Sequence, residues 1–68
     1  MENLKECRMN NYYSFNYMAK QLGISKTYYW QLEHNQRRIS YEMAVKIASI
    51  FNKKPDEIFY DEFRKKIK

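Results

Sequence analysis

One stretch of the chain, residues 18–33, constrains the fold more than any other. It contains the only glycine of the sequence, Gly23, between two segments whose apolar residues recur at helical spacing. Glycine adopts a left-handed backbone conformation at little cost, which suits a sharp corner between helices. Ser25 can cap the second helix, and the small side chain of Ala19 allows the two helices to approach closely. The stretch therefore predicts a helix, a tight turn and a second helix, which is the arrangement of a helix-turn-helix.

The rest of the sequence predicts an all-α fold, because apolar residues keep a helical period almost throughout. The Asn10–Asn11 pair favours a break, and Asn35 can end a helix in a left-handed conformation. The expected helices cover residues 2–9, 15–21 and 26–33, a segment capped by Ser40, and a segment that begins at Pro55. Ser14 can cap the helix at residues 15–21, and a turn is expected at residues 52–54. The expected core consists of Leu4, Met18, Ala19, Leu22, Tyr29, Leu32, Ala44, Ile47, Ala48, Phe51, Ile58 and Phe59.

The positive charge is concentrated on the segment that carries the motif. The 68 residues suffice for one small domain and carry a net charge of +5. Residues 7–54 contain eight Lys or Arg and two Glu, whereas the two ends together contain five basic and six acidic residues. Such a distribution is typical of nucleic-acid binding, and a solvated basic surface is the alternative.

Composition also argues against several other classes of protein. One cysteine and one histidine cannot form an internal disulfide or a four-ligand zinc site. No apolar run is long enough to span a membrane, and the first residues lack the apolar region of a secretory signal. We therefore expect a cytoplasmic protein without cofactor, metal or small-molecule ligand. An enzyme is not expected, because no acid–base pair, phosphate loop or activated nucleophile is visible.

Several landmarks along the chain together match one known family. These landmarks are Leu4-Lys-Glu-Cys-Arg8, Ser14, Met18-Ala-Lys-Gln-Leu-Gly-Ile-Ser25, Leu32-Glu33, Arg37-Arg38, Ala44, Ile47-Ala48 and Asp56-Glu-Ile-Phe59. With them, the chain resembles the phage-repressor and Cro-like helix-turn-helix (XRE) proteins over about residues 4–59, and the resemblance implies a compact five-helix, lambda-repressor-like DNA-binding domain. Within the family it is similar to small stand-alone regulators such as restriction–modification controller proteins or phage Cro and repressor proteins.

The resemblance also implies a structural ion pair between Arg8 and Glu33. A carboxylate at the end of a helix is disfavoured by the helix dipole unless a cation compensates it, so the residues supply an independent reason for the pair. The chain departs from the family at the start of the second helix, where Phe15 replaces a glutamine that contacts the DNA backbone. Asn35 replaces a frequent glycine, Trp30 replaces a small or polar residue, and Tyr12-Tyr13 replace Gly-Leu.

The family pattern implies which side chains contact DNA bases. Lys26, Thr27 and Gln31 match the base-reading positions of the recognition helix, and the alternative is that they are merely exposed. Lysine can donate to guanine, glutamine can pair with adenine, and threonine can contact a thymine methyl group. The expected contacts to the DNA backbone come from Ser25, Tyr28, Asn35, Gln36, Arg37 and Arg38.

Two interpretations are open for each of four other side chains. Phe15 lies near the expected DNA surface or packs on a neighbouring ring, and Trp30 covers a sugar or thymine methyl or packs against Tyr17 or Phe15. His34 is a phosphate-proximal side chain or a pH switch. Cys7 lies on the apolar face of the first helix, which favours a buried apolar residue over a redox sensor.

The C-terminal residues predict a dimer contact. We divide the chain into a helix-turn-helix domain, residues 1–59, and an extension, residues 60–68, which forms a dimer contact, folds back or frays. The dimer candidates are Phe59, Tyr60, Phe63 and Ile67. The sequence thus predicts a double-stranded DNA-binding transcriptional regulator, a repressor that binds a palindromic operator as a homodimer. The alternative is an antitoxin-like or adaptor protein whose main partner is another protein.

Overall fold

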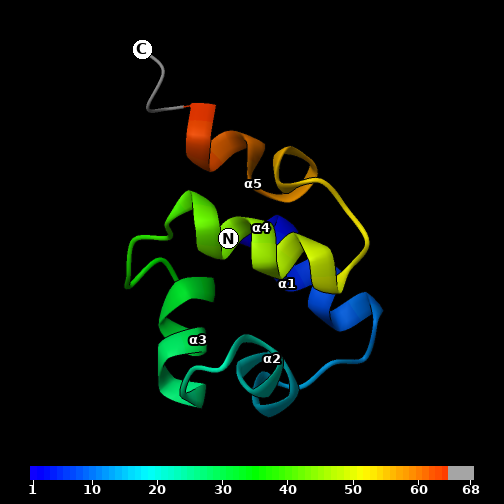
Figure 1. Ribbon diagram of the computed structural model, residues 1–68, viewed down its shortest axis with the longest axis vertical. Coiled ribbons are helices and arrows are strands. Elements are labelled where there is room, and N and C mark those ends of the chain that lie inside the picture. The colour runs from blue at the N-terminus through cyan, green and yellow to red at the C-terminus, as the bar shows by residue number, and fades with distance from the viewer. Residues whose placement is uncertain (65–68) are drawn as a thin grey trace.

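Five α-helices make up the chain as described by the structure, a computed structural model that gives the backbone of residues 1–64 and the side chains of residues 1–60. Within this part of the chain there is no strand, so the predicted all-α fold is confirmed. The helices are α1 (Glu2–Asn10), α2 (Phe15–Leu22), α3 (Lys26–Glu33), α4 (Tyr41–Ile50) and α5 (Pro55–Arg64) (Figure 1).

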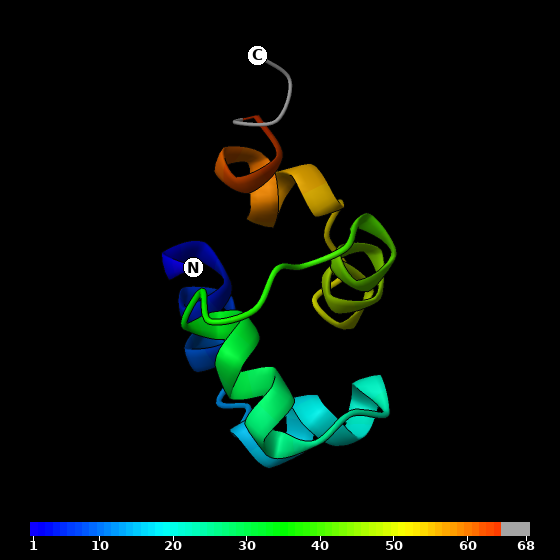
Figure 2. The same cartoon turned by 90° about the vertical axis from the view of Figure 1, so that its left-hand side faces the viewer.

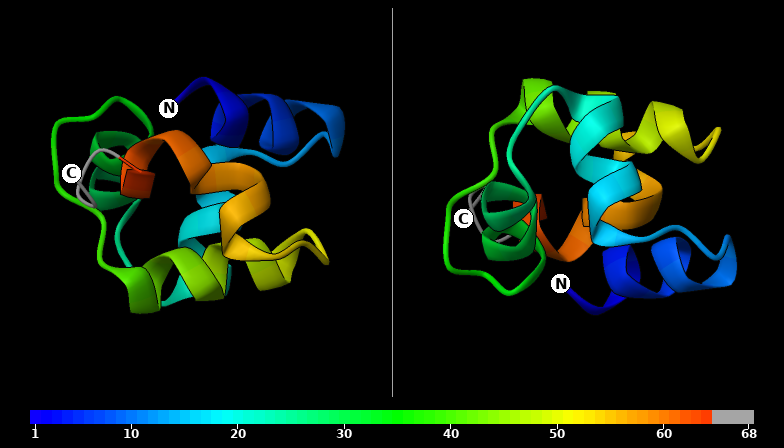
Figure 3. Two further views of the ribbon diagram at one scale, coloured as in Figure 1. Left: turned by 90° about the horizontal axis from the view of Figure 1, so that it is seen from above. Right: turned by 90° about the horizontal axis from the view of Figure 1, so that it is seen from below.

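The helices that form the motif lie at one end of the molecule, and α5 lies at the other end (Figure 1). Helix α2 packs against α3 and α4, while α5 packs against α4 and α1. Helix α1 also contacts α3 and so connects the two ends. The loop from α3 runs along one side to reach α4 (Figure 2), and the view from below shows α2 and α3 together (Figure 3). This arrangement leaves one side of α3 uncovered.

The core contains almost all of the expected residues. Leu22 and Phe51 are only half-buried, because each lies at the end of a helix next to a turn. Phe51 instead stacks on Tyr13, with 5.9 Å between the ring centroids and 25° between the ring planes. Ile39, which the sequence placed in a loop without a core role, is 4% exposed. The buried apolar residues are Leu4, Met18, Ala19, Tyr29, Leu32, Ile39, Ala44, Ile47, Ala48, Ile58 and Phe59.

Serine caps begin three of the helices, as the sequence predicts. The hydroxyl oxygens of Ser14, Ser25 and Ser40 each accept a hydrogen bond from the backbone N–H three residues later, at 3.0–3.1 Å. Each bond satisfies one of the N–H groups that a helix leaves unpaired at its start. Helix α5 begins differently, with Pro55 in its first turn and the Glu57 carboxylate accepting from the Lys54 backbone N–H at 2.9 Å.

Four helices end in the same left-handed turn. The left-handed residues are Tyr12, Gly23, Asn35 and Asn52, with φ values of 58°, 70°, 58° and 57°. At Gly23 the next backbone N–H, of Ile24, donates back to the carbonyl of Ala19 at 3.0 Å. The other three turns repeat this pattern, which is a Schellman motif that satisfies carbonyls at the helix end. Glycine and asparagine are residue types that indicate such an end, and they occupy three of the four positions. The fourth position is Tyr12, and tyrosine does not indicate a helix end.

Helix α1 ends at the Asn10–Asn11 pair, where the sequence predicts a break. Asn10 is the last helical residue, one later than expected, and the left-handed residue of the turn is Tyr12. The side-chain amide of Asn11 donates to the carbonyl of Cys7 at 2.7 Å, so this asparagine helps to close the helix end. Tyr12 is 95% exposed, and no packing of its ring accounts for a conformation that tyrosine adopts at a cost.

Helix α5 is kinked at Phe59, the last residue of the predicted domain. The backbone there has φ −112° and ψ 19°, and the helix continues to Arg64. Phe59 is fully buried and belongs to the core. It does not lie on the surface, so it cannot make the dimer contact for which the sequence made it a candidate. Tyr60 is exposed, while the side chain of Phe63 and all of Ile67 lie outside the described residues.

Candidate DNA-binding site

Helix α3 has an inner side and an outer side. Tyr29, Leu32 and Glu33 recur at spacings of three and one and are buried against the rest of the molecule. Lys26, Thr27 and Trp30 project from the other side and are exposed, with Gln31 half-buried between the two sides. The exposed side includes the first residues of the helix, which are those that a recognition helix presents to base edges.

Arg8 and Glu33 form the ion pair that the resemblance implies. The Arg8 Nε lies 2.8 Å from Glu33 Oε2, and one terminal nitrogen lies 3.0 Å from Glu33 Oε1. The arrangement is bidentate, and the two side chains are only 12% and 1% exposed. Hydrogen bonding to Glu33 raises the pKa of Arg8. The pair fixes the end of α3 relative to α1.

The same guanidinium also holds the start of α2. Its other terminal nitrogen donates to the carbonyl of Tyr13 at 3.0 Å, and its central carbon lies 4.3 Å from the centre of the Phe15 ring. Phe15 lies 6.0 Å from the ring of Tyr29, in a tilted arrangement. The second interpretation of Phe15, packing on a neighbouring ring, is therefore what the structure shows. Arg8 thus connects α1, the start of α2 and the end of α3.

Tyr29 places a hydroxyl group in the core beside this ion pair. The hydroxyl is buried and has no hydrogen-bond partner among the residues that the structure describes. Burial raises the pKa of Tyr29, and the nearby carboxylate of Glu33 raises it further. The phenol is therefore strongly held in its neutral form.

Trp30 stacks on His34, one turn further along the chain. The ring centroids are 4.1 Å apart with 16° between the planes, so Trp30 packs on neither of the two rings considered from the sequence. Spacing of four residues on a helix brings such rings together. The Nδ1 of His34 donates to the carbonyl of Trp30 at 2.9 Å, since a carbonyl can only accept. His34 therefore lies at the end of α3, next to the exposed side.

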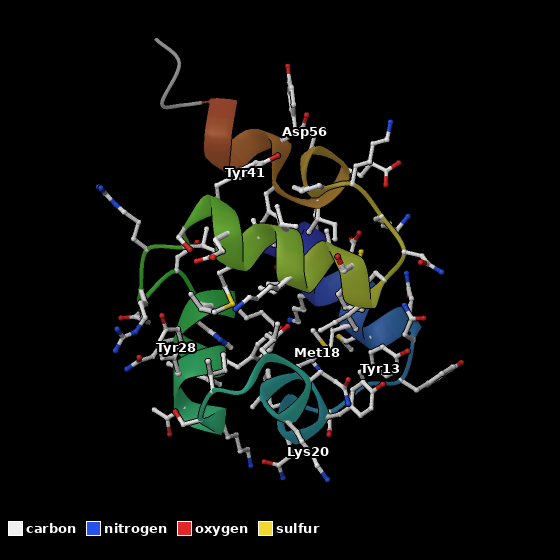
Figure 4. The ribbon with its side chains drawn as sticks, in the orientation of Figure 1. Tyr13, Met18, Lys20, Tyr28, Tyr41 and Asp56 are labelled. Carbon is white, nitrogen blue, oxygen red and sulfur yellow. The ribbon has the colours of Figure 1, made fainter. Side chains whose placement is uncertain are left out.

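The loop after α3 returns toward the helix and carries two arginines. Asn35 turns the chain in its left-handed conformation, and the buried Ile39 anchors the far end of the loop. The Arg37 Nε donates to Gln31 Oε1 at 3.1 Å, and its guanidinium lies 4.4 Å from the centre of the Tyr28 ring. Tyr28 lies on the outer edge of α3, away from the buried Met18 (Figure 4). The sequence did not predict this contact.

The outer side of α3 and its loop are positively charged. Residues 25–38 contain three basic side chains, Lys26, Arg37 and Arg38, all exposed, and one acidic side chain, Glu33. Glu33 is buried and paired with Arg8, so it does not offset the charge of the exposed side chains. The remaining predicted backbone contacts, Ser25, Asn35 and Gln36, are exposed around the same helix.

Cys7 lies away from this surface and is half-buried. Desolvation by burial is the main cause that raises the pKa of its thiol, and the neighbouring Lys53 opposes the shift. A raised pKa lowers the thiolate fraction at neutral pH, which agrees with a packing role. Among the described residues, no three His, Cys, Asp or Glu side chains gather closely enough to hold a metal ion.

Comparison with known proteins identifies the family. Residues 4–58, most of the chain, match a protein family described as helix-turn-helix. The chain belongs to the Cro/repressor-like (XRE) helix-turn-helix family. The XRE match covers α1 to α4 and the start of α5, so the DNA-binding and regulatory character of the family applies to the domain just described. No curated protein and no solved structure gives a significant match. No described helix of this XRE chain has the length and apolar character needed to cross a membrane.

Proposed function

We propose that this protein is a sequence-specific repressor that binds a palindromic operator as a homodimer, with α3 in the major groove of the DNA. The observation that carries the proposal is the exposed outer side of α3 in an XRE-family chain. Lys26 and Thr27 project from the first turn of the helix, and Gln31 follows one turn later. A helix of this kind fits the major groove, where each base pair presents a distinct pattern of donors and acceptors.

The proposed roles follow from the position and chemistry of each side chain. Lys26, Thr27 and Gln31 contact base edges, and Trp30 with His34 lies against the sugar–phosphate backbone. Contacts to phosphates position the domain and make the affinity dependent on salt. These come from the loop and the capped start of α3, namely Ser25, Tyr28, Asn35, Gln36, Arg37 and Arg38.

The homodimer is proposed because one domain of this size covers only a few base pairs. Two copies on half-sites one helical turn apart would supply the missing contacts. Helix α5, at the end of the molecule opposite α2 and α3, is the proposed contact, with Tyr60 exposed on it (Figure 1). Phe59 is excluded from that contact by its burial in the core.

Selection of bound duplexes from a random pool tests the proposal. We expect an enriched palindrome whose half-sites lie about 10 base pairs apart, and two protein chains on each duplex. With this operator overlapping a promoter, the protein is expected to lower transcription. A sequence without symmetry bound by one chain would contradict the dimer, and increased transcription would contradict repression.

Two lysine variants localise the binding surface. Lys26→Ala should weaken binding to the selected duplex by about tenfold, since a good base contact contributes about 1–3 kcal/mol. Lys54→Ala is the matched control, because Lys54 is exposed in the α4–α5 turn on the other side of the molecule (Figures 1 and 3). Equal losses would contradict the placement of α3.

A chain that binds no duplex at low salt but forms a stoichiometric complex with another protein would support the antitoxin-like or adaptor alternative.

A further inference from the structure

The contact between Arg37 and Gln31 joins a residue predicted to bind phosphate to one predicted to read a base. Arg37 lies across the outer edge of α3, hydrogen-bonded to Gln31 at 3.1 Å and stacked over the Tyr28 ring at 4.4 Å. The backbone supports the same approach, since the N–H of Gln36 donates to the carbonyl of Gln31 at 2.7 Å. Arg37 is thus held by two side chains and by the turn that precedes it.

This contact fixes which way the Gln31 amide points. A guanidinium carries five N–H donors and no acceptor, so the atom of Gln31 that faces Arg37 has to be the carbonyl oxygen. The NH₂ group lies in the same amide plane, on the other side of the Cδ atom from the oxygen, and so points away from Arg37. Gln31 is half-buried, which restricts the other orientations of its side chain. The Gln31 amide could otherwise present either its oxygen or its NH₂ group to a base. With the oxygen turned toward Arg37, it presents its NH₂ donors.

The geometry points to Arg37 as a positioning residue that sets the base preference of Gln31. Guanine presents two acceptors in the major groove, O6 and N7, and thymine presents one, O4, so both suit an NH₂ donor. Adenine is paired by glutamine only when the amide oxygen accepts from its N6 amino group, but Arg37 already uses one of the two lone pairs of that oxygen and places a cation beside it. A second donor is disfavoured next to this cation, whereas an acceptor on the base is favoured. Gln31 therefore selects guanine first and thymine second, instead of the adenine expected from the residue type alone. This inference rests on the proposed function.

The same contact couples the two kinds of DNA recognition. Arg37 uses its Nε for Gln31, and the four N–H groups of its terminal nitrogens suit a phosphate. A phosphate bound in that position would hold the guanidinium in place and, through it, the amide. Arg37 thereby connects affinity for the backbone with the reading of one base pair.

A substitution that keeps the charge tests this inference. In Arg37→Lys the ammonium still attracts phosphate, but lysine lacks the planar fork that bonds Gln31 and stacks on Tyr28. The selected duplex is varied at the base pair whose preference disappears in Gln31→Ala, and affinities are measured for all four base pairs. The wild type is expected to prefer guanine over adenine by about tenfold at this position, and Arg37→Lys is expected to lose most of that preference. Arg38→Lys, which alters a proposed phosphate contact, is the matched control for the ratio of affinities between base pairs and not for the affinity itself. That ratio should stay at the wild-type value, because Arg38 makes no such contact with α3 among the described residues.

A wild-type preference for adenine, or an unchanged preference in Arg37→Lys, would overturn the inference while leaving DNA binding intact. Failure of the wild type to bind any duplex at low salt would overturn the proposed function instead. A measurement without DNA checks the contact itself. Nuclear Overhauser effects between the Arg37 side chain and the Tyr28 ring, and a slowly exchanging Arg37 Nε proton, are expected in the wild type. Their absence would show that the contact does not form and would overturn the inference independently of DNA.

Discussion

The two sides of α3 differ in almost every property although they belong to one helix of eight residues. Tyr29, Leu32 and Glu33 are at most 3% exposed and connect the helix to α1 and the core. Lys26, Thr27 and Trp30 contact the solvent, and Trp30 is 42% exposed. The comparison shows that this helix separates the residues that hold the fold from those that are exposed to the solvent and proposed to contact DNA. Substitutions on the two sides should therefore give different phenotypes.

The largest effect is expected on the inner side, from Glu33→Ala. The variant leaves the Arg8 guanidinium without its partner while only 12% of that side chain is exposed. Breaking a buried pair by removing one partner costs about 3 kcal/mol, which is a large part of the stability of a small domain. Urea denaturation followed by circular dichroism measures this loss, and DNA binding should fall with the folded fraction.

A double variant separates the charge from the packing. Arg8→Met combined with Glu33→Leu removes both charges and keeps apolar volume, so most of the lost stability should return. If the double variant is as unstable as Glu33→Ala, an unpaired buried charge is not the cause of the loss, and the fold requires the hydrogen bonds of Arg8 themselves, including the one to the Tyr13 carbonyl.

The next effect belongs to the outer side, from Gln31→Ala. Affinity for the selected duplex should fall by about tenfold, and affinity for random DNA should fall by less than about twofold. The urea midpoint should stay unchanged, because Gln31 is not part of the core. Fluorescence anisotropy with the two duplexes measures the ratio. Equal losses on both duplexes would remove Gln31 from base reading.

A smaller effect on the inner side depends on pH. Burial raises the pKa of Tyr29, whereas an unfolded tyrosine loses its proton near a pKa of about 10. The folded state binds more protons above that pH, so the free energy of unfolding is undiminished below about pH 10 and decreases above it. The decrease is at most about 1.4 kcal/mol per pH unit. Tyr29→Phe should remove most of it, as shown by urea denaturation at about pH 8 and about pH 11.

The control for this experiment is Tyr12→Phe, which changes a tyrosine that is 95% exposed. This variant should keep the pH dependence of the wild type. At neutral pH, Tyr29→Phe should not lower stability, because the hydroxyl that it removes is buried without a described partner. A large loss at neutral pH would mean that the hydroxyl makes a bond essential to the core.

The smallest effect is expected from Arg38→Ala, in the loop that follows α3. Removing one phosphate contact should weaken all DNA sequences alike and reduce the slope of log affinity against log salt by about one. The slope is obtained from titrations at several salt concentrations with both the selected and a random duplex. An unchanged slope would place Arg38 away from the phosphates.

Sequence reasoning could predict the helices because the residues that begin and end them act locally. The serine caps form one hydrogen bond to a backbone N–H three residues away, and Gly23 and Asn35 take the left-handed conformation that their residue types tolerate. The Arg8–Glu33 pair lies 25 residues apart in sequence. The family resemblance implied this pair, and the carboxylate at a helix end gave an independent reason to expect a compensating cation.

Other contacts could not be predicted, because they depend on the path of the chain in three dimensions. Arg37 reaches Gln31 and Tyr28 only because the loop turns at Asn35 and is anchored by Ile39. Tyr12 occupies a left-handed position against the preference of its residue type, in the turn that the Tyr13 N–H closes on the Arg8 carbonyl, and the residue type gave no sign of it. The contacts of α3 with DNA remain predictions that the binding experiments will decide.

Trp30, stacked on His34, gives α3 a fluorescence signal of its own. The sequence contains one tryptophan, so selectively excited emission originates entirely from the outer side of α3. In the proposed complex, a duplex docked on this side would change the polarity around the indole, which lies 4.1 Å from the His34 ring. Unlabelled protein would therefore report its encounter with an oligonucleotide through a single chromophore.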